Sequence, residues 1–433
     1  MSKLLAGAAR EIITPPVGGR LYGYRPDVYS KEVHDDLTVT AVALESDGVR
    51  ALLISITVCL LNTDLATNLR KAVGKATNIP WRHVIVSATH THSGPCTAGE
   101  TGWGEIDTEF CDQILFPKTI KAAKIAVSSL RLALLGVADG ESRVGINRRE
   151  LTIHNKVTLG QNPWGCFDPT MTVLALREPD GKPIVNMIHY GAHCTACGLN
   201  HEITRDWAGP MIDRLEAETN ALTCFFNGAE GDVGPRLTNG RTVGNLAYAM
   251  ELGGVAALDA VSIYRRIREY RDASLVVKTD QVRLPYKPIL DLETAQREYD
   301  RLHRQDAVNI TLRTITYYKN IIDAYQSGLP KDTHFTYEQT VLAIGPVVFL
   351  PFPFEFFSEI SLRLRKASPF PHTLCLGCTN GDQGYLPTED QLCRGGYEIE
   401  MFKTSGVQTL TDDADYHIIA EHRRILEELK CTE

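Results

Sequence analysis

The sequence lacks an excess of positive charge, a long apolar run and a secretory signal pattern. Of its 433 residues, 45 are Lys or Arg and 53 are Asp or Glu, which gives a formal net charge of -8. Binding to nucleic-acid phosphates requires a net basic surface, so we expect no nucleic acid partner. Because no eighteen-residue apolar stretch occurs, we also expect no integral membrane association. The 11 scattered cysteines fit reduced thiols, which predicts a cytoplasmic protein.

Common catalytic signatures are missing as well. The chain contains no Gly-x-Ser-x-Gly elbow, which argues against a serine hydrolase of the common α/β type. It contains no phosphate-binding loop that ends in Lys-Ser/Thr. Two Cys-x-x-Cys pairs, Cys194 with Cys197 and Cys375 with Cys378, invite a structural zinc held by four thiolates. The two pairs lie too far apart in the sequence for a compact zinc ribbon, so we do not expect that site.

The sequence does have the pattern of an α/β protein. Hydrophobic residues make up 43% of the chain and charged residues 23%, as in ordinary globular domains. Short β-branched runs alternate with longer amphipathic stretches, which predicts mixed β-sheets covered by helices. The predicted strands are 37–44, 49–56, 83–87, 171–175, 184–188, 222–226, 340–344 and 347–350. The predicted helices are 63–74, 109–129, 207–219, 242–268, 355–366 and a helix or helix pair at 292–325.

Two histidines follow the strand predicted at 83–87. His90 and His92 are separated by one residue, and residues i and i+2 of an extended backbone point to the same side. Both imidazoles can therefore face one cavity at a strand end, where α/β proteins hold ligands. The alternative is a pair of hydrogen-bonded histidines without a ligand. The His-x-His pattern alone leaves both interpretations open.

Further candidates for metal or proton chemistry follow later strands. His193 lies in a turn of small residues and is a better candidate ligand than His189, which lies within an apolar run. Glu355 follows a Pro/Phe-rich turn, and a carboxylate buried there must face an arginine or a cation. Tyr385 and Tyr397 lie in loops, which can place aromatic hydroxyls over a site.

A glycine-rich loop, residues 227–236, follows the strand predicted at 222–226. Its backbone N–H groups suit an oxyanion or an anionic substrate group. Arg236 adds a guanidinium that can bind an anion with two hydrogen bonds. We therefore predict substrate binding by four residues of this loop, Gly231, Asp232, Gly234 and Arg236.

Taken together, these stretches resemble the neutral ceramidase family, in particular its N-terminal catalytic domain. Residues 88–95, Ala-Thr-His-Thr-His-Ser-Gly-Pro, are similar to the family's most recognisable motif, and residues 6–16 are similar to its start. The resemblance implies an α/β catalytic domain with one zinc ion per chain. The ligands that it implies are His90, His193, Glu355 and Tyr385. The residues that it implies for substrate polarisation and proton transfer are His92, Arg148 and Tyr397.

Departures from the family pattern shape the function that we expect. The family has a serine where this chain has Gly234 and an asparagine where it has Arg236. We find neither the family's secretory signal nor its appended immunoglobulin-like domain, and we therefore expect a short cytoplasmic member. The expected activity is that of a zinc-dependent hydrolase, in which metal-activated water cleaves an amide, ester or lactone bond of a small polar substrate. His92 would move the proton at an ordinary histidine pKa.

Alternatives to this interpretation concern the activity and the metal. The chain could be a true ceramidase that hydrolyses the amide of N-acylsphingosine, or a noncatalytic binding protein that keeps the metal. Mn²⁺ or Fe²⁺ could replace Zn²⁺ at such a ligand set. Because the implied ligands extend from position 90 to position 385, we predict a single domain over 1–433, with a possible internal boundary near 272–285. The expected partner is a small-molecule substrate.

Overall fold

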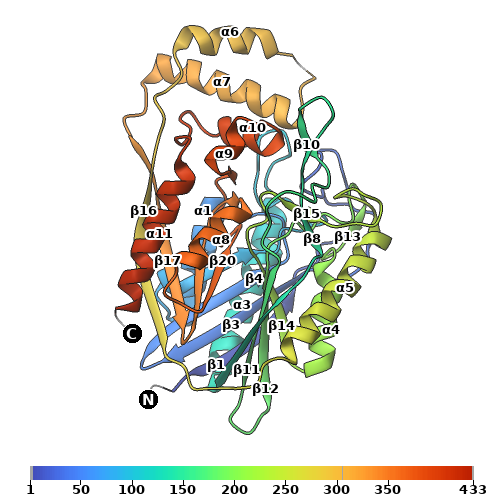
Figure 1. The fold of residues 1–433 in the computed structure, drawn as a ribbon, viewed down its shortest axis with the longest axis vertical. Coiled ribbons are helices and arrows are strands. Elements are labelled where there is room, and N and C mark those ends of the chain that lie inside the picture. Colours follow the sequence, from blue (N-terminus) through green and yellow to red (C-terminus); the bar gives the residue numbers. More distant parts are fainter. Residues whose placement is uncertain (1–2, 305, 432–433) are drawn as a thin grey trace.

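The computed structural model describes residues 3–304 and 306–431, which build three main β-sheets with helices on their outer faces (Figure 1). The first sheet has the order β5-β4-β3-β1-β6, the second β14-β12-β11-β7 and the third β16-β17-β18-β20. The first contains β1 (Leu5–Ile12), β3 (Thr38–Ser46), β4 (Val49–Ile56), β5 (Val84–Ala88) and β6 (Arg131–Leu132). The second contains β7 (Leu134–Glu141), β11 (Thr170–Arg177), β12 (Pro183–Tyr190) and β14 (Leu222–Asn227). The third contains β16 (Leu275–Pro285), β17 (His334–Ile344), β18 (Val347–Pro351) and β20 (His372–Leu376).

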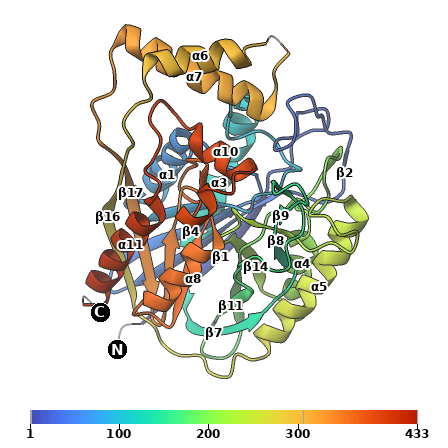
Figure 2. The ribbon, with the colours of Figure 1, turned by 45° about the horizontal axis from the view of Figure 1, so that its top comes forward.

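Helices cover the outer face of each sheet, which confirms the predicted α/β class (Figure 2). The first sheet carries α1 (Thr63–Thr77) and α3 (Phe116–Ser128), and the second carries α4 (Ala208–Thr219) and α5 (Leu246–Tyr264). The third carries α8 (Ser358–Ala367) and α11 (Ala414–Lys430). The short helices are η1 (Trp81–His83), α2 (Thr108–Phe110), which runs through a π-helical turn (Cys111–Leu115) into α3, α9 (Glu389–Leu392) and α10 (Tyr397–Lys403).

The three sheets share one buried core because several strands are apolar on both faces. Val39 and Ala41 of β3 face the helices of the first sheet, whereas Val42 and Leu44 face the space between the sheets. Such two-sided burial requires the continuous apolar runs seen in the sequence. The central cluster takes residues from all three sheets: Leu4, Leu53, Ile85, Leu174, Val185, Met187, Leu275, Leu342, Phe349 and Leu374. This core therefore continues across the boundary predicted near 272–285.

Four short ladders lie outside the main sheets. They pair β2 (Glu32–Val33) with β13 (Glu202–Ile203), β8 (Gly145–Asn147) with β15 (Val233–Pro235), β9 (Arg149–Leu151) with β10 (Val157–Leu159) and β19 (Glu355–Phe356) with β21 (Tyr385–Leu386). A helical hairpin, α6 (Leu292–Leu302) and α7 (Asn309–Ser327), stands beyond the ends of β16 and β17 at the top of Figure 1. The sequence predicts this region as a helix or helix pair, and the structure shows the pair.

Some element boundaries differ from those predicted, for local reasons. The helix predicted from 355 begins at Ser358, because Glu355 and Phe356 pair as a strand with Tyr385 and Leu386. The Asp232 side chain accepts a hydrogen bond from the Ser358 backbone N–H at 2.7 Å. The helix predicted from 242 begins at Leu246, after Asn245 caps it. Strands β1 and β7 are not predicted, since their alanine, glycine and charged residues have low strand propensity.

Helix α5 is long and apolar enough to cross a membrane by length and composition alone, with a mean hydropathy of 1.4. In the structure it packs on α4, β7 and β11, with 44% of its most apolar window buried. Small residues allow this close packing, since a Cβ at Gly253 would lie 2.7 Å from the Trp207 carbonyl oxygen. Packing within the fold thus accounts for part of its apolar character.

Because the central cluster joins strands from both sides of 272–285, we expect the chain to unfold in one cooperative transition. Calorimetry should give a single peak in which the van't Hoff and calorimetric enthalpies agree. Phe349→Ala should lower the free energy of unfolding by about 3–5 kcal/mol and move the whole peak. Two peaks, or a cooperative transition in a fragment of residues 1–271, would contradict the single domain.

Candidate metal centre

The four predicted metal ligands come together where strands of different sheets end. His90 follows β5 of the first sheet, and His193 follows β12 of the second. Glu355 and Tyr385 are register partners in the parallel β19–β21 ladder. Each of the four residues is at most 5% exposed. Segments far apart in the sequence therefore meet in one enclosed polar cluster.

The distances within this cluster are those of side chains that could share one ligand. Glu355 Oε2 lies 3.0 Å from His193 Nε2 and 3.6 Å from His90 Nε2. The Tyr385 hydroxyl lies 3.3 Å from His193 Nε2. Among the described residues, ligand atoms of His90, His193 and Glu355 form a group that could hold a metal ion.

The other ring nitrogens fix the tautomers of the two histidines. His90 Nδ1 lies 3.1 Å from the Cys59 carbonyl oxygen, and His193 Nδ1 lies 2.8 Å from that of Glu230. A carbonyl can only accept, so each Nδ1 carries the hydrogen and each Nε2 presents a lone pair. Burial lowers the pKa of both imidazoles, which keeps them neutral. Two lone pairs therefore point toward the Glu355 carboxyl.

A cation relieves this arrangement. Glu355 Oε2 is buried and accepts no hydrogen bond from any described residue, although a buried acceptor without a donor is costly. Burial also raises the pKa of the Glu355 carboxyl to about 7, and a bound cation would favour its ionised form. Two imidazoles and a carboxylate are donors that zinc accepts, and the Tyr385 hydroxyl oxygen lies beside them. The residues present therefore fit a metal ion held by His90, His193, Glu355 and Tyr385.

A second layer of buried groups lies behind His90. The Cys378 thiol lies 3.3 Å from His90 Nδ1 and donates a hydrogen bond to Glu230 Oε1 at 2.7 Å. The Glu230 backbone carbonyl in turn orients His193. These contacts fix both imidazole planes, as partners behind ligating histidines do in metal sites. The sequence marks Glu230 only through its glycine-rich loop and Cys378 only through its Cys-x-x-Cys pair with Cys375.

His92 lies next to the centre but has a different environment from that predicted. Its Nε2 lies 3.2 Å from His90 Nε2. Burial, reinforced by the positive charge of Arg148, lowers the pKa of His92 to about 3, so the prediction of an ordinary histidine pKa is wrong. Gly23, at φ +122°, leaves room for the ring, because any Cβ there would overlap Nδ1 of His92. Tyr24 packs edge-on against the imidazole at 5.0 Å.

Arg148 and Tyr397 complete the polar end of the site. Arg148 Nη2 donates to the Tyr385 hydroxyl at 2.9 Å, and its Nε donates to Glu398 Oε1 at 2.8 Å. Although burial opposes the charge, the neighbouring Tyr385 and Glu398 raise the pKa of Arg148. Tyr397 packs edge-on against Tyr385 at 5.7 Å. Burial raises the pKa of Tyr397 well above its usual value, so its hydroxyl stays protonated.

The four residues predicted to bind substrate lie outside the cavity next to the candidate metal centre. Gly231 allows the close approach of the Glu355 backbone, because a Cβ there would lie 2.5 Å from the Glu355 carbonyl oxygen. Asp232 anchors the start of α8. Arg236 Nε donates to the Arg143 carbonyl at 2.9 Å, and its guanidinium lies over the Phe167 ring. Of these, none lines the cavity next to the centre.

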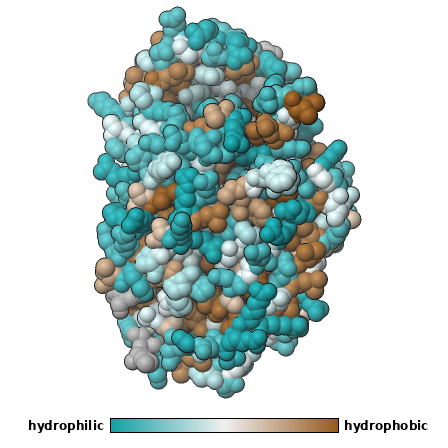
Figure 3. Space-filling view, viewed as in Figure 1, coloured by the Kyte–Doolittle hydropathy of each residue, from teal (hydrophilic) through white to brown (hydrophobic). Residues whose placement is uncertain are grey.

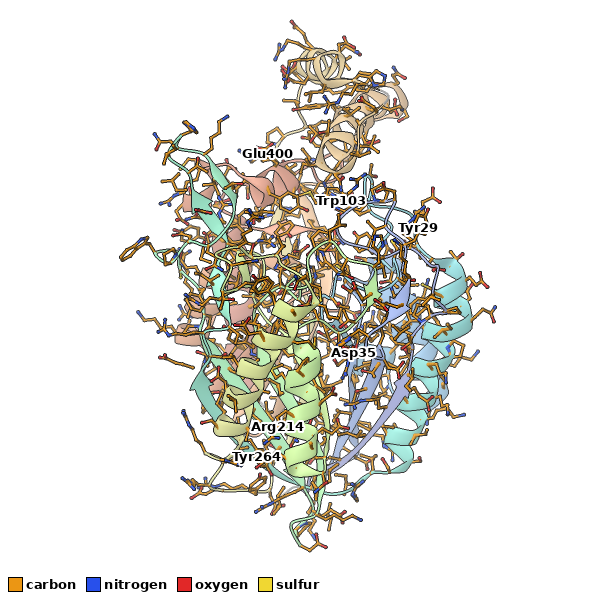
Figure 4. All side chains as sticks on the ribbon, turned by 90° about the vertical axis from the view of Figure 1, so that its right-hand side faces the viewer. Tyr29, Asp35, Trp103, Arg214, Tyr264 and Glu400 are labelled. Carbon is orange, nitrogen blue, oxygen red and sulfur yellow. The ribbon has the colours of Figure 1, made fainter. Side chains whose placement is uncertain are left out.

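That cavity has a volume of about 560 Å³, within the range of small-molecule sites. One end is formed by His92, Arg148, His193, Tyr385 and Tyr397. The remaining wall combines five apolar or aromatic side chains, Tyr24, Trp103, Leu159, Val243 and Ile310, with five polar ones, Glu150, Thr195, Arg241, Thr242 and Asn309. Most of the surface that the cavity exposes is nevertheless apolar. Figure 4 shows Trp103 below the α6–α7 hairpin, where α7 begins.

Thr242 is a cavity residue that the sequence does not indicate. A Cβ at Gly234 would lie 2.8 Å from both Cβ and Cγ2 of Thr242 and 3.3 Å from Cβ of Arg148. The threonine side chain therefore fills the space into which a side chain at position 234 would project. Thr242 is 5% exposed, and within the described part of the chain its hydroxyl forms no hydrogen bond. A free hydroxyl thus faces the cavity at this point.

The fold matches solved ceramidase structures over nearly the whole chain. Neutral ceramidase from Pseudomonas aeruginosa aligns with a TM-score of 0.74 and 18% identity, over 99% of this chain and 74% of that one. A ceramidase complexed with C2 aligns with a TM-score of 0.72 and 16% identity, over 99% and 75%. The architecture is that of the neutral ceramidase catalytic domain.

Sequence comparisons agree with this class. Neutral ceramidase A of Dictyostelium discoideum is 27% identical over 227 residues, which are 46% of this chain and 31% of the relative. Neutral ceramidase B of the same organism is 27% identical over 229 residues, 46% of this chain and 30% of the relative. The chain thus spans about a third of the length of these curated relatives. No family model matches it. It is a neutral ceramidase-like domain, which confirms the resemblance seen in the sequence.

Replacing the Glu355 carboxylate should reduce metal binding without unfolding the protein. We expect Glu355→Gln to weaken metal affinity by more than about 100-fold, beyond the effect typical of outer-layer partners, because the amide cannot balance the cation's charge. Elemental analysis after dialysis against a chelator measures this. The matched control is Glu359→Gln on α8, which removes an acid outside the cluster. Equal metal content in Glu355→Gln and wild type would contradict the centre.

The contact between Gly234 and Thr242 should appear as a coupling energy. Gly234→Ser should lower the free energy of unfolding by about 1–3 kcal/mol through overpacking, since the new Cβ meets Thr242. Combining it with Thr242→Gly should recover most of this loss, and a double-mutant cycle measures the recovery. Strictly additive effects would show that the two positions do not share this space.

Proposed function

We propose that this domain is a metal-dependent hydrolase that cleaves the amide bond of an N-acyl lipid of the ceramide type. One observation carries the proposal: a largely apolar cavity of about 560 Å³ ends at the candidate metal centre. An apolar wall suits an acyl chain, and a polar end suits an amide group. The relatives named neutral ceramidase support amide hydrolysis. This support favours the ceramidase alternative over the small polar substrate predicted from the sequence.

The side chains at the polar end have complementary roles in this proposal. A bound Zn²⁺ would act as a Lewis acid and lower the pKa of a water toward about 7. Arg148, fixed by Glu398, places a permanent positive charge where negative charge develops on the substrate carbonyl oxygen. Tyr397, protonated in its buried setting, can donate a hydrogen bond to the same oxygen.

His92 would handle the proton. Because burial lowers its pKa to about 3, His92 is neutral at neutral pH. In the tautomer that carries its hydrogen on Nδ1, its Nε2 can accept a proton as a weak base. A weakly basic imidazole also gives the proton up readily, so His92 can pass it to the amine that leaves. Its position beside His90, with Tyr24 packed against its ring, holds Nε2 toward the centre.

Substrate chain length tests the cavity. For N-acyl amines of increasing acyl length, we expect kcat/KM to rise by about fourfold per buried methylene until the apolar wall is covered. Release of the amine product measures turnover. Ester and lactone analogues of equal length, and N-acetyl amino acids as small polar amides, are the comparisons. Faster turnover of the small polar amides would contradict the proposal.

Loss of one hydroxyl tests the polar end. We expect Tyr397→Phe to lower kcat by about 10²–10³-fold, as for loss of one donor to a developing oxyanion, while the metal content stays unchanged. Tyr325→Phe, at a partly exposed position on α7, is the matched control. An unchanged kcat in Tyr397→Phe would remove Tyr397 from the proposed chemistry.

A further inference from the structure

The two large apolar side chains with the greatest exposure among the described residues lie in one short segment. Ile153 is 93% exposed and Trp164 is 94% exposed, and the next, Leu258, is 69% exposed. The segment is residues 149–166, which we call the apolar ribbon. It contains β9, β10 and the loop that follows them, and it also exposes Leu151 and Leu159. Exposed apolar groups gathered in this way mark interaction surfaces.

A hydrogen-bonded turn and the loop after it carry Ile153 and Trp164 on the outside of the ribbon. Leu151 pairs with Val157 in the β9–β10 ladder. Across the turn, the Thr152 N–H and hydroxyl both donate to the Lys156 carbonyl at 2.9 Å. Asn162 ties the following loop back, because its Nδ2 donates to the Arg149 carbonyl at 3.1 Å. The exposure of Ile153 and Trp164 is thus set by ordered backbone.

The ribbon is continuous with the cavity. Leu159 and Glu150 of the ribbon line the cavity wall together with Val243, and Val243 is itself 40% exposed. Val308, 53% exposed, lies next to the cavity residue Asn309. Figure 3 shows apolar surface at the upper right, where Figure 1 draws β10. Figure 4 shows the β9–β10 strands projecting beyond their neighbours at the upper left. The ribbon therefore borders the cavity through Leu159, whereas Trp164 lies at a neighbouring hollow that Leu151 and Val157 also line.

The charge of the ribbon is unlike that of the rest of the chain. Residues 149–166 contain two basic residues, Arg149 and Lys156, and one acid, Glu150, whereas the whole chain has a net charge of -8. Lys156 lies in the same turn as Ile153, is exposed to solvent and forms no ion pair with any described residue. An exposed lysine in the same segment as an exposed tryptophan and an exposed isoleucine supplies the groups that bind lipid headgroups and the acyl boundary.

We propose that the apolar ribbon docks on a lipid surface that carries anionic headgroups. Ile153 and Trp164 insert at the boundary of the acyl chains, and Lys156 contacts the headgroups. Apolar insertion and basic attraction are each weak alone and together give stable binding. The mouth of the cavity then faces the lipid layer. This deepens the proposed function, because a lipid substrate could pass from that layer into the cavity without crossing water.

Vesicle binding tests the proposal without requiring activity. Wild-type protein should sediment with vesicles of phosphatidylcholine and phosphatidylglycerol. Ile153→Ser and Trp164→Ser should each weaken binding by about tenfold. Lys156→Ser should weaken it by about fivefold on these vesicles and hardly at all on pure phosphatidylcholine. Trp103 and Trp207 are buried, and Trp81 is half-buried with Arg70 and Arg82 over its ring. A blue shift of the tryptophan emission on binding should therefore be lost in Trp164→Ser.

Leu258→Ser is the matched control, since Leu258 is an exposed apolar residue on α5, away from the ribbon. We expect it to bind vesicles like wild type. Failure of wild type to bind, or equal loss in Leu258→Ser, would overturn the proposal. So would concentration-dependent dimerisation that disappears in Ile153→Ser/Trp164→Ser, because a second copy would then cover the ribbon.

A soluble substrate separates this proposal from the proposed function. On a short-chain N-acyl amide below its aggregation limit, Ile153→Ser/Trp164→Ser should keep the wild-type kcat/KM, since neither residue lines the cavity. Vesicle binding without hydrolysis of any N-acyl amide would count against the proposed function and leave the ribbon in place. Hydrolysis of the soluble amide without vesicle binding would count against the ribbon alone.

Discussion

A buried carboxylate that faces two imidazole lone pairs is the constraint on which the site depends. Glu355 Oε2 lies 3.0 Å and 3.6 Å from the two Nε2 atoms, and the hydrogens of both imidazoles are committed to backbone carbonyls on the other side. Two imidazole lone pairs that face a carboxylate in a dry interior are costly, although the Tyr385 hydroxyl is hydrogen-bonded to that carboxyl. A cation between them would stabilise all three groups at once.

The scaffold makes this possible by bringing strand ends of all three sheets to one place. The central apolar cluster fixes the sheets relative to one another, and the free energy of its burial holds the polar cluster in position. Close approaches complete the arrangement. Gly231 admits the Glu355 backbone and Gly23 admits the His92 ring. Small residues at these two points are thus required by the site as much as the ligands are.

The sequence predicts the site residues that follow apolar strands. It does not predict those that irregular loops bring to the site. His90, His193 and Glu355 become candidates because each follows a buried apolar strand, although the His-x-His pattern alone leaves a ligand-free pair open. Only the family resemblance joins them with Tyr385 into one ligand set. Tyr24 and Thr242 come from loops without periodicity, so nothing local marks them. The α/β class follows from alternating patterns, whereas β1 and β7 escape because their small residues lower strand propensity.

The structure explains why we propose a lipid substrate although the sequence predicts a small polar one. The prediction of a small polar substrate depends on Arg236 facing the site. Pro235 and its neighbours pair with β8, and this pairing directs Arg236 toward the Arg143 carbonyl and the Phe167 ring. The cavity then keeps Arg148 and Arg241 as its cations, and the Arg148 charge is already shared with Tyr385 and Glu398. What remains for a ligand to contact along most of the wall is apolar surface, and apolar surface favours a chain over a charge.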